Sequence, residues 1–123
     1  MIFPDDLQYT EEHVWIESDG ETAKIGITEF AVNQLGEVQY VGLADQGQEL
    51  MAGETFTEIE FSEMIQEFSC PLSGEAIQVN DFLAESPELI SENPYENWIL
   101  ELKLADPSEL DDLLTAAEYE KSL

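Results

Sequence analysis

The sequence contains no arginine and only three lysines, whereas Asp and Glu together number 29, so the formal net charge is −26 at pH 7. Nucleic acids and anionic membrane surfaces are bound through cations, and this composition therefore argues against both as partners. A protein with a basic surface is the natural complement. Most of the individual acids are expected to form a solvated shell that aids solubility or tolerance of salt.

Cysteine and histidine are each present once, as Cys70 and His13. A single cysteine forms no internal disulfide, and one Cys with one His is too few for an ordinary zinc site. A catalytic Cys–His pair would have to join these two residues across a long sequence gap. We therefore expect no catalytic residues, no metal and no enzymatic activity. His13 is expected to be a hydrogen-bonded structural residue and Cys70 a half-buried structural thiol.

Long apolar runs are also missing, and no signal peptide is visible, so a cytoplasmic protein is expected. Hydrophobic residues nevertheless make up 43% of the chain, which is enough to fold despite the charge. The length and the lack of a linker predict one domain over residues 1–123.

Short stretches of alternating hydrophobicity, separated by glycine turns, predict a mainly β protein. A short helix is expected over 29–35, between the cap residue Thr28 and Gly36, and a brief helical turn after Pro87. The pattern Asp106-Pro107-Ser108-Glu109 predicts the start of one amphipathic C-terminal helix. The expected strands are 14–16, 22–27, 37–43, 55–61, 65–70, 75–79 and 98–104.

The strands 55–61 and 65–70 are expected to form a β-hairpin with Glu63 near its tip. Glutamates are dense around this tip, at Glu58, Glu60, Glu63 and Glu67. They fit either a docking surface or a chance cluster in a very acidic chain. Aromatic residues elsewhere are expected to pack in the core or against the sheets, namely Trp15, Tyr40, Tyr95 and Trp98.

Several segments together resemble the glycine cleavage system H protein family, in its order and spacing. They are residues 9–15 (YTEEHVW), 26–36 (GITEFAVNQLG), 70–75 (CPLSGE), 79–81 (VND), 86–95 (SPELISENPY) and 104–114 (LADPSELDDLL). The resemblance implies a barrel-sandwich hybrid fold, related to lipoyl and biotinyl domains, with short helices and a C-terminal helix. It also implies a carrier whose lipoyl-lysine moves an aminomethyl group between glycine cleavage enzymes.

The resemblance places Glu63 where the family has the lipoyl lysine. The family motif reads approximately Glu-Ser-Val-Lys-Ala, and the aligned residues here are Glu60, Phe61, Ser62, Glu63 and Met64. A carboxylate supplies no amine for the lipoyl amide, so no cofactor is expected. Two further departures are Val14, where the family usually has Glu, and Asn97, where it has glycine before Trp98.

Three functions are therefore weighed. The leading prediction is a non-lipoylated interaction or regulatory module that binds a glycine-cleavage or lipoate-handling partner through Glu60, Glu63 and Glu67. The alternative is a lipoyl carrier of aminomethyl groups, the only interpretation that requires lipoate. An independent enzyme is the weakest of the three, because no nucleophile–base pair or metal cluster is evident.

Overall fold

The protein is built from two antiparallel sheets, which a computed structural model describes for residues 3–62 and 64–123. The larger sheet has the strand order β1-β2-β3-β9-β8-β5, and the smaller has the order β4-β6-β7. The strands of the larger sheet are β1 (Gln8–Tyr9), β2 (Val14–Ser18), β3 (Thr22–Ile27), β5 (Glu49–Leu50), β8 (Gly74–Val79) and β9 (Leu100–Leu104). Those of the smaller sheet are β4 (Val38–Val41), β6 (Thr55–Phe61) and β7 (Met64–Ser69). The mainly β sandwich fold predicted from the sequence is confirmed.

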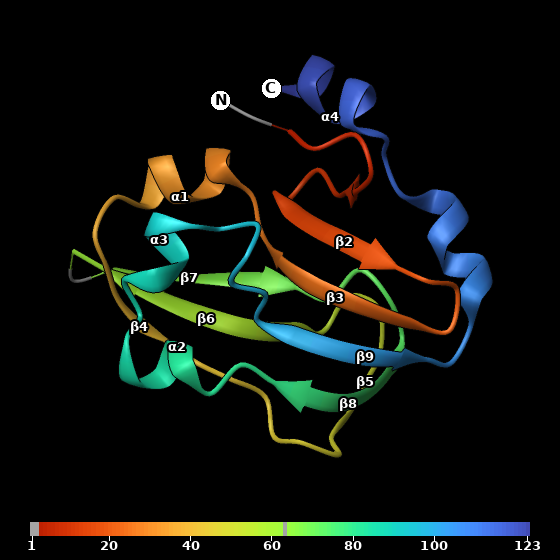
Figure 1. The fold of residues 1–123 in the computed structure, drawn as a ribbon, viewed down its shortest axis with the longest axis horizontal. Helices are drawn as coiled ribbons and strands as arrows, with labels where there is room; N and C mark the ends of the chain where they lie inside the picture. The colour runs from red at the N-terminus through yellow and green to blue at the C-terminus, as the bar shows by residue number, and fades with distance from the viewer. Residues whose placement is uncertain (1–2, 63) are drawn as a thin grey trace.

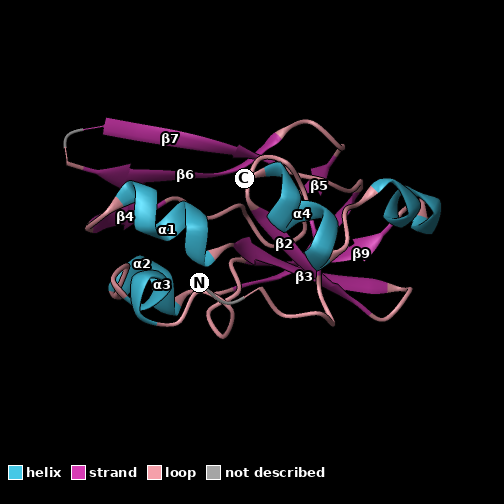
Figure 2. Cartoon of the chain, turned by 90° about the horizontal axis from the view of Figure 1, so that it is seen from above, coloured by secondary structure: helices cyan, strands magenta, loops and turns pink. Residues whose placement is uncertain are grey.

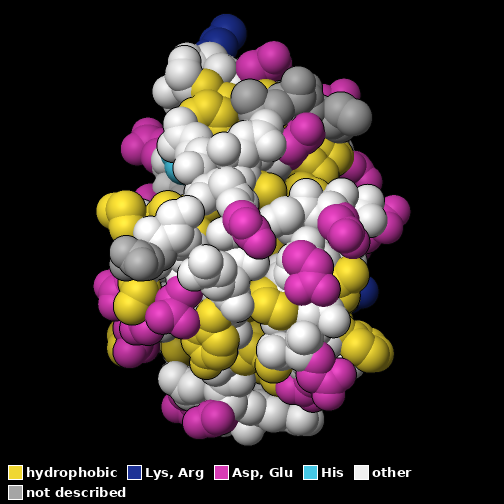
Figure 3. All heavy atoms as spheres, turned by 90° about the vertical axis from the view of Figure 1, so that its left-hand side faces the viewer, with side chains coloured by type: hydrophobic (Ala, Val, Ile, Leu, Met, Phe, Trp, Pro, Cys, Tyr) yellow, Lys and Arg dark blue, Asp and Glu magenta, His cyan; other side chains and the backbone are white. Residues whose placement is uncertain are grey.

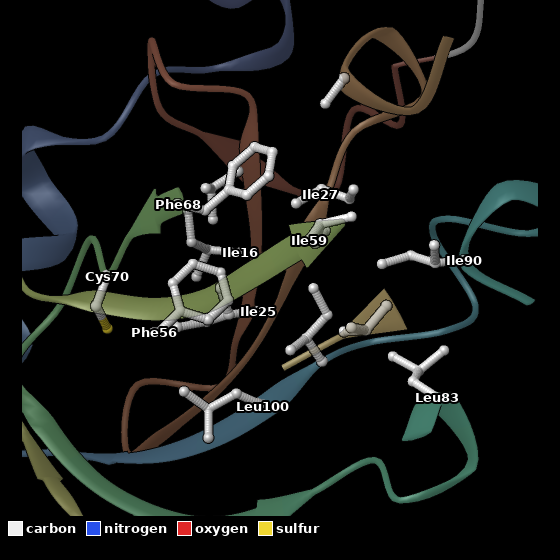
Figure 4. Close-up of a cluster of buried hydrophobic side chains, with 14 of the residues drawn as sticks. Ile16, Ile25, Ile27, Phe56, Ile59, Phe68, Cys70, Leu83, Ile90 and Leu100 are labelled. Carbon is white, nitrogen blue, oxygen red and sulfur yellow. The ribbon is translucent and has the colours of Figure 1, made fainter. Parts of the chain in front are cut away.

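The main core lies between the two sheets (Figure 4). The larger sheet contributes Ile16, Ile25 and Leu100, and the smaller contributes Phe56, Ile59 and Phe68, all buried. Leu83 and Ile90 enter the same cluster from two short helices, α2 (Phe82–Glu85) and α3 (Leu89–Glu92). Both helices have four residues, too few to give a period in the sequence. Only α3 was expected, because Ser86 and Pro87 supply a cap residue and a proline before it.

Helix α1 (Glu29–Leu35) begins and ends where the sequence predicts. The Thr28 hydroxyl accepts a hydrogen bond from the amide of Ala31, and Gly36 takes a positive φ of 76° just after the last turn. The buried face of α1 is formed by Ala31, Val32 and Leu35. This helix therefore starts beside β3 and leads the chain across to β4 (Figure 2).

The C-terminal segment differs from the single helix that was expected. It forms a 3₁₀ helix, Pro107–Asp112, and then a separate helix α4, Ala116–Ser122. Between them Leu114 exchanges two backbone hydrogen bonds with Tyr9, of 2.8 and 2.9 Å, which draws the chain into an extended bridge. Thr115 and Glu118 then start α4 with a reciprocal capping box. Leu110, Leu113 and Leu114 have the spacing of one helix face, but pairing with Tyr9 of β1 overrides that spacing.

A second buried cluster forms where the two ends of the chain meet, and we call it the terminal aromatic cluster: Tyr9, Trp15 and Tyr119, with Leu7 and Ala116. The rings of Tyr9 and Tyr119 lie 4.9 Å apart, and Phe3 packs edge-on against Tyr119. The cluster attaches α4 to the larger sheet (Figure 1). Within residues 3–62 and 64–123, none of the helices is long and apolar enough to cross a membrane.

Candidate functional site

Strands β6 and β7 form the predicted hairpin, and its two strands are joined by residues 62 and 63 alone. The closing pair is Phe61 with Met64. Ser62 has φ of 46°, in the left-handed region that the first residue of a type I′ hairpin turn requires. Glu63, the predicted attachment position and partner contact, lies outside the residues that the structure describes.

One row of side chains crosses the outer side of the smaller sheet, because Tyr40 on β4 pairs with Glu60 on β6, which pairs with Ile65 on β7. Tyr40 is 48% exposed and Ile65 is 58% exposed. The prediction that Tyr40 packs in the core or on a sheet is therefore wrong as regards burial. A register shift between Val38 and Tyr40 breaks the simple alternation of β4, so that Val38 is buried and Tyr40 faces solvent.

The next row places two glutamates directly opposite each other, Glu58 on β6 and Glu67 on β7. Both are exposed. Like charges in directly opposed cross-strand positions are destabilising. The lysines that would relieve this repulsion lie on other elements, Lys24 on β3, Lys103 on β9 and Lys121 on α4. We call the surface formed by Glu58, Glu60, Glu67, Tyr40 and Ile65 the acidic sheet face.

An open hollow of about 310 Å³ adjoins this surface beside β4 and β6. Its lining includes Tyr40, Glu58 and Gly42. The amide of Gly42 donates to the carbonyl of Glu58 over 2.8 Å, and the Thr57 hydroxyl donates to the Gly42 carbonyl over 2.7 Å, so hydrogen bonds join three of the lining residues. Figure 3 views the hairpin end of the molecule: acidic side chains are spread among hydrophobic ones, and cations are visible only at the margins.

The predicted contact residues Glu60 and Glu67 therefore lie on one side of one sheet, although they do not pair with each other. Tyr40 and Ile65 were not predicted to be exposed apolar members of this surface. Alternation of Ile65 with Gln66 and Glu67 was the available signal, because Ile65 shares a strand face with Glu67. The arrangement has no reactive group, but it offers negative charge beside apolar contact area.

His13 lies in a different place, beside the terminal aromatic cluster. Its Nδ1 lies 2.7 Å from the hydroxyl of Tyr119, which lies 2.8 Å from the hydroxyl of Thr28. Burial lowers the pKa of His13 from its ordinary value, partly opposed by the negative charge of Glu12, and burial raises the pKa of Tyr119. His13 has φ of 72°, a left-handed conformation that ends the turn from Thr10. The structural role predicted for His13 is confirmed.

Cys70 is buried, and its thiol donates to the carbonyl of Leu72 over 3.0 Å. Burial raises the pKa of this thiol to about 11. The reactive thiolate is therefore scarce near neutral pH. The predicted structural role of Cys70 is confirmed, but the thiol is fully buried and not half-buried as predicted. Among the described residues, no group of three or more His, Cys, Asp or Glu side chains is arranged to hold a metal ion.

Comparison with known proteins gives one consistent result. The family model described as "Glycine cleavage H-protein" matches residues 7–123. The chain is 47% identical over 118 residues to the glycine cleavage system H protein of Symbiobacterium thermophilum, covering 95% of this chain and 92% of the other. It is 44% identical over 118 residues to the protein of the same name from Nostoc sp., covering 95% and 91%. A crystal structure of a glycine cleavage system H protein from Mycobacterium marinum superposes with a TM-score of 0.88 at 30% identity, covering 98% of this chain and 100% of that one.

Proposed function

Because the chain belongs to the glycine cleavage H-protein family, we propose that it is a family member without a lipoyl group, which acts by docking on a protein partner and catalyses no reaction itself. The single observation that carries this proposal is the residue at position 63. The turn that joins β6 to β7 contains Ser62 and Glu63 and no lysine. The proposed protein has the family fold but lacks the lipoyl-lysine that the carrier function needs.

The residues at the hairpin do not fit a lipoyl group, since the amide bond to lipoate needs a side-chain amine. Strands β6 and β7 and their connection contain none. The three lysines are placed within β3, within β9 and near the end of α4. None of these positions is a hairpin turn. Lipoate is therefore not part of the proposed function.

The acidic sheet face supports a partner with a basic surface. Glu58, Glu60 and Glu67 lie beside the exposed rings and chains of Tyr40 and Ile65. Protein interfaces commonly combine apolar anchors with charges that steer the partner and set the on-rate. We propose a component of glycine cleavage or a lipoate-handling enzyme as the partner, acting in the cytoplasm.

A lipoyl carrier of aminomethyl groups is the second candidate, and a specific observation favours it. Relatives named glycine cleavage system H protein align with nearly the whole chain at 44% and 47% identity. Under this alternative, attachment would have to use a residue other than Glu63. The two candidates differ in one measurable property, the covalent mass of the protein.

Intact-mass spectrometry after incubation with lipoate ligase, ATP and lipoate separates the two candidates. We expect no added lipoyl mass on the protein as it stands. The matched control is Glu63→Lys: an adduct on this variant alone would show that the ligase still engages the hairpin. A stoichiometric lipoyl adduct on the unaltered chain would overturn the proposal and establish the carrier.

A further inference from the structure

The two sheets differ in the length of their edge strands. The larger sheet ends in β1 and β5, which have two residues each. Very short edge strands are one way in which proteins avoid unwanted pairing. The smaller sheet ends in β7, which has six residues and lies at the outer boundary of the molecule (Figure 2). Residues 64–67 of β7 are all exposed, so the longest edge in the described chain is also open.

The hairpin register determines which backbone groups of β7 do not bond to β6. In a hairpin with two connecting residues the closing pair, here Phe61 and Met64, exchanges both hydrogen bonds, and pairs alternate from there. Met64 and Gln66 therefore bond to β6, whereas the N–H and C=O groups of Ile65 and Glu67 point away from it. The Gln66 side chain donates to the carbonyl of Glu67 over 3.1 Å, which agrees with this direction.

We propose that the open edge of β7 accepts an extended, lysine- or arginine-bearing segment of a protein partner as a fourth strand of the smaller sheet. This inference rests on the proposed docking function and states how the partner is recognised. Backbone groups of Ile65 and Glu67 supply the pairing, and side chains supply the choice of partner. On the outer side the added strand lies next to Ile65 and Glu67, with Glu58 and Glu60 one strand further in.

Charge selects a cationic segment over a second copy of this chain. Pairing of two β7 edges would bring Glu58, Glu60 and Glu67 of one copy toward the same residues of the other. Each copy carries a formal charge of −26, so this approach is opposed at long range as well. β7 itself contains neither the lysine nor the proline that often protects an edge. A basic strand would relieve the repulsion that a second copy would increase.

The probe for this proposal is a synthetic peptide of alternating lysine and valine, titrated into the ¹⁵N-labelled full chain. Two matched peptides carry N-methyl groups on the backbone, one at every lysine and the other at every valine. Their side chains and charges are the same, but each has lost the alternate set of N–H donors. Only one set can face β7, so we expect one methylated peptide to bind about tenfold more weakly and the other to be little changed. The amides of Ile65 and Glu67 should gain protection from hydrogen exchange.

Two variants separate backbone pairing from side-chain contact. Ile65→Pro removes an outward donor without removing a bond to β6, whereas Ile65→Thr keeps the donor and loses the apolar side chain. Ile65→Pro should weaken binding about tenfold, and Ile65→Thr should weaken it less. Circular dichroism and the melting temperature verify that both variants fold.

The outcomes distinguish the two proposals. No salt-dependent binding of any peptide would overturn the docking function itself. Salt-dependent binding that is equal for all three peptides would leave the docking function in place and overturn the added strand. A dimer of the free chain in sedimentation at physiological salt, abolished by Ile65→Pro, would overturn the choice of a cationic partner in favour of a second copy.

Discussion

The terminal aromatic cluster and the acidic sheet face use polar groups in opposite ways. In the cluster, the Tyr119 hydroxyl bonds to both the His13 ring and the Thr28 hydroxyl, and the Trp15 indole donates to the carbonyl of Pro94 over 3.0 Å. On the acidic sheet face, like charges oppose each other and apolar side chains are exposed. The cluster is arranged to stabilise the fold, whereas the face tolerates local repulsion between its glutamates.

The largest expected effect is the loss of Tyr119. Tyr119→Ala removes a fully buried ring, leaves a cavity next to Tyr9 and takes a hydrogen-bond partner from His13 and Thr28. It should lower the free energy of unfolding by about 3–5 kcal/mol, measured by urea denaturation. The control Ile65→Ala on the acidic sheet face should change it by no more than about 0.5 kcal/mol. Similar losses in both variants would abolish the contrast between the two regions.

The next largest effect is expected at Gly26, over which the Trp15 ring packs. A Cβ added at Gly26 would lie 2.6 Å from three atoms of the indole. Gly26→Ala should therefore displace Trp15 and destabilise the protein by about 1–3 kcal/mol. Gly20→Ala is the contrasting case, because nothing lies within 4 Å of its added methyl group but its φ of +97° strains the backbone, so any loss there arises without contact with Trp15. Intrinsic tryptophan fluorescence should change in Gly26→Ala alone.

A smaller effect of opposite sign is expected on the acidic sheet face. Glu67→Lys replaces a like-charged pair with Glu58 by an opposite-charged pair, and should stabilise the protein by about 0.2–1 kcal/mol. The matched control is Glu17→Lys, which changes the net charge equally but places a lysine opposite Lys24. That control should gain less or lose stability. Equal gains in thermal unfolding would mean that only the total charge matters.

The smallest effect concerns pH and His13. Burial holds the pKa of His13 below its ordinary value of 6.5, so the folded protein binds this proton less readily than the unfolded chain. The contribution of neutral His13 to stability is fully present at a pH above the ordinary pKa of 6.5, and it is lost as the pH falls below that value. The unaltered chain should therefore lose stability relative to His13→Gln between pH 7.5 and pH 5. Carboxylate titration affects both proteins and cancels in the difference; a difference that does not change with pH would contradict the prediction.

Local signals in the sequence predicted the elements that are specified locally. Helix α1 has its cap at Thr28 and its glycine at Gly36, and β6 begins and ends at the expected residues. The C-terminal helix was predicted as one because Leu110, Leu113 and Leu114 have helical spacing, but the bridge of Leu114 to Tyr9 is a contact between the two ends of the chain. No local pattern contains that information.

Part of the candidate site was also predicted from local patterns in the sequence. Glu60 and Glu67 were placed on one hairpin by the alternation of its strands, which the register confirms. The exposure of Tyr40 was not predicted from the sequence, because it depends on a register shift between β4 and β6. A one-residue irregularity in pairing reverses the side to which a side chain points, and the sequence of one strand does not specify its partner's register.

The buried thiol of Cys70 can be used to measure how often the folded protein opens. It is the only cysteine of the chain, it lies in the main core, and the pKa of its thiol is raised to about 11. Because the sulfur is buried, an alkylating reagent can reach and react with it only when the surrounding structure opens. The rate of alkylation under native conditions therefore measures how often the structure around Cys70 opens, without an introduced label. A partner strand bound along β7 should slow that rate in proportion to its occupancy.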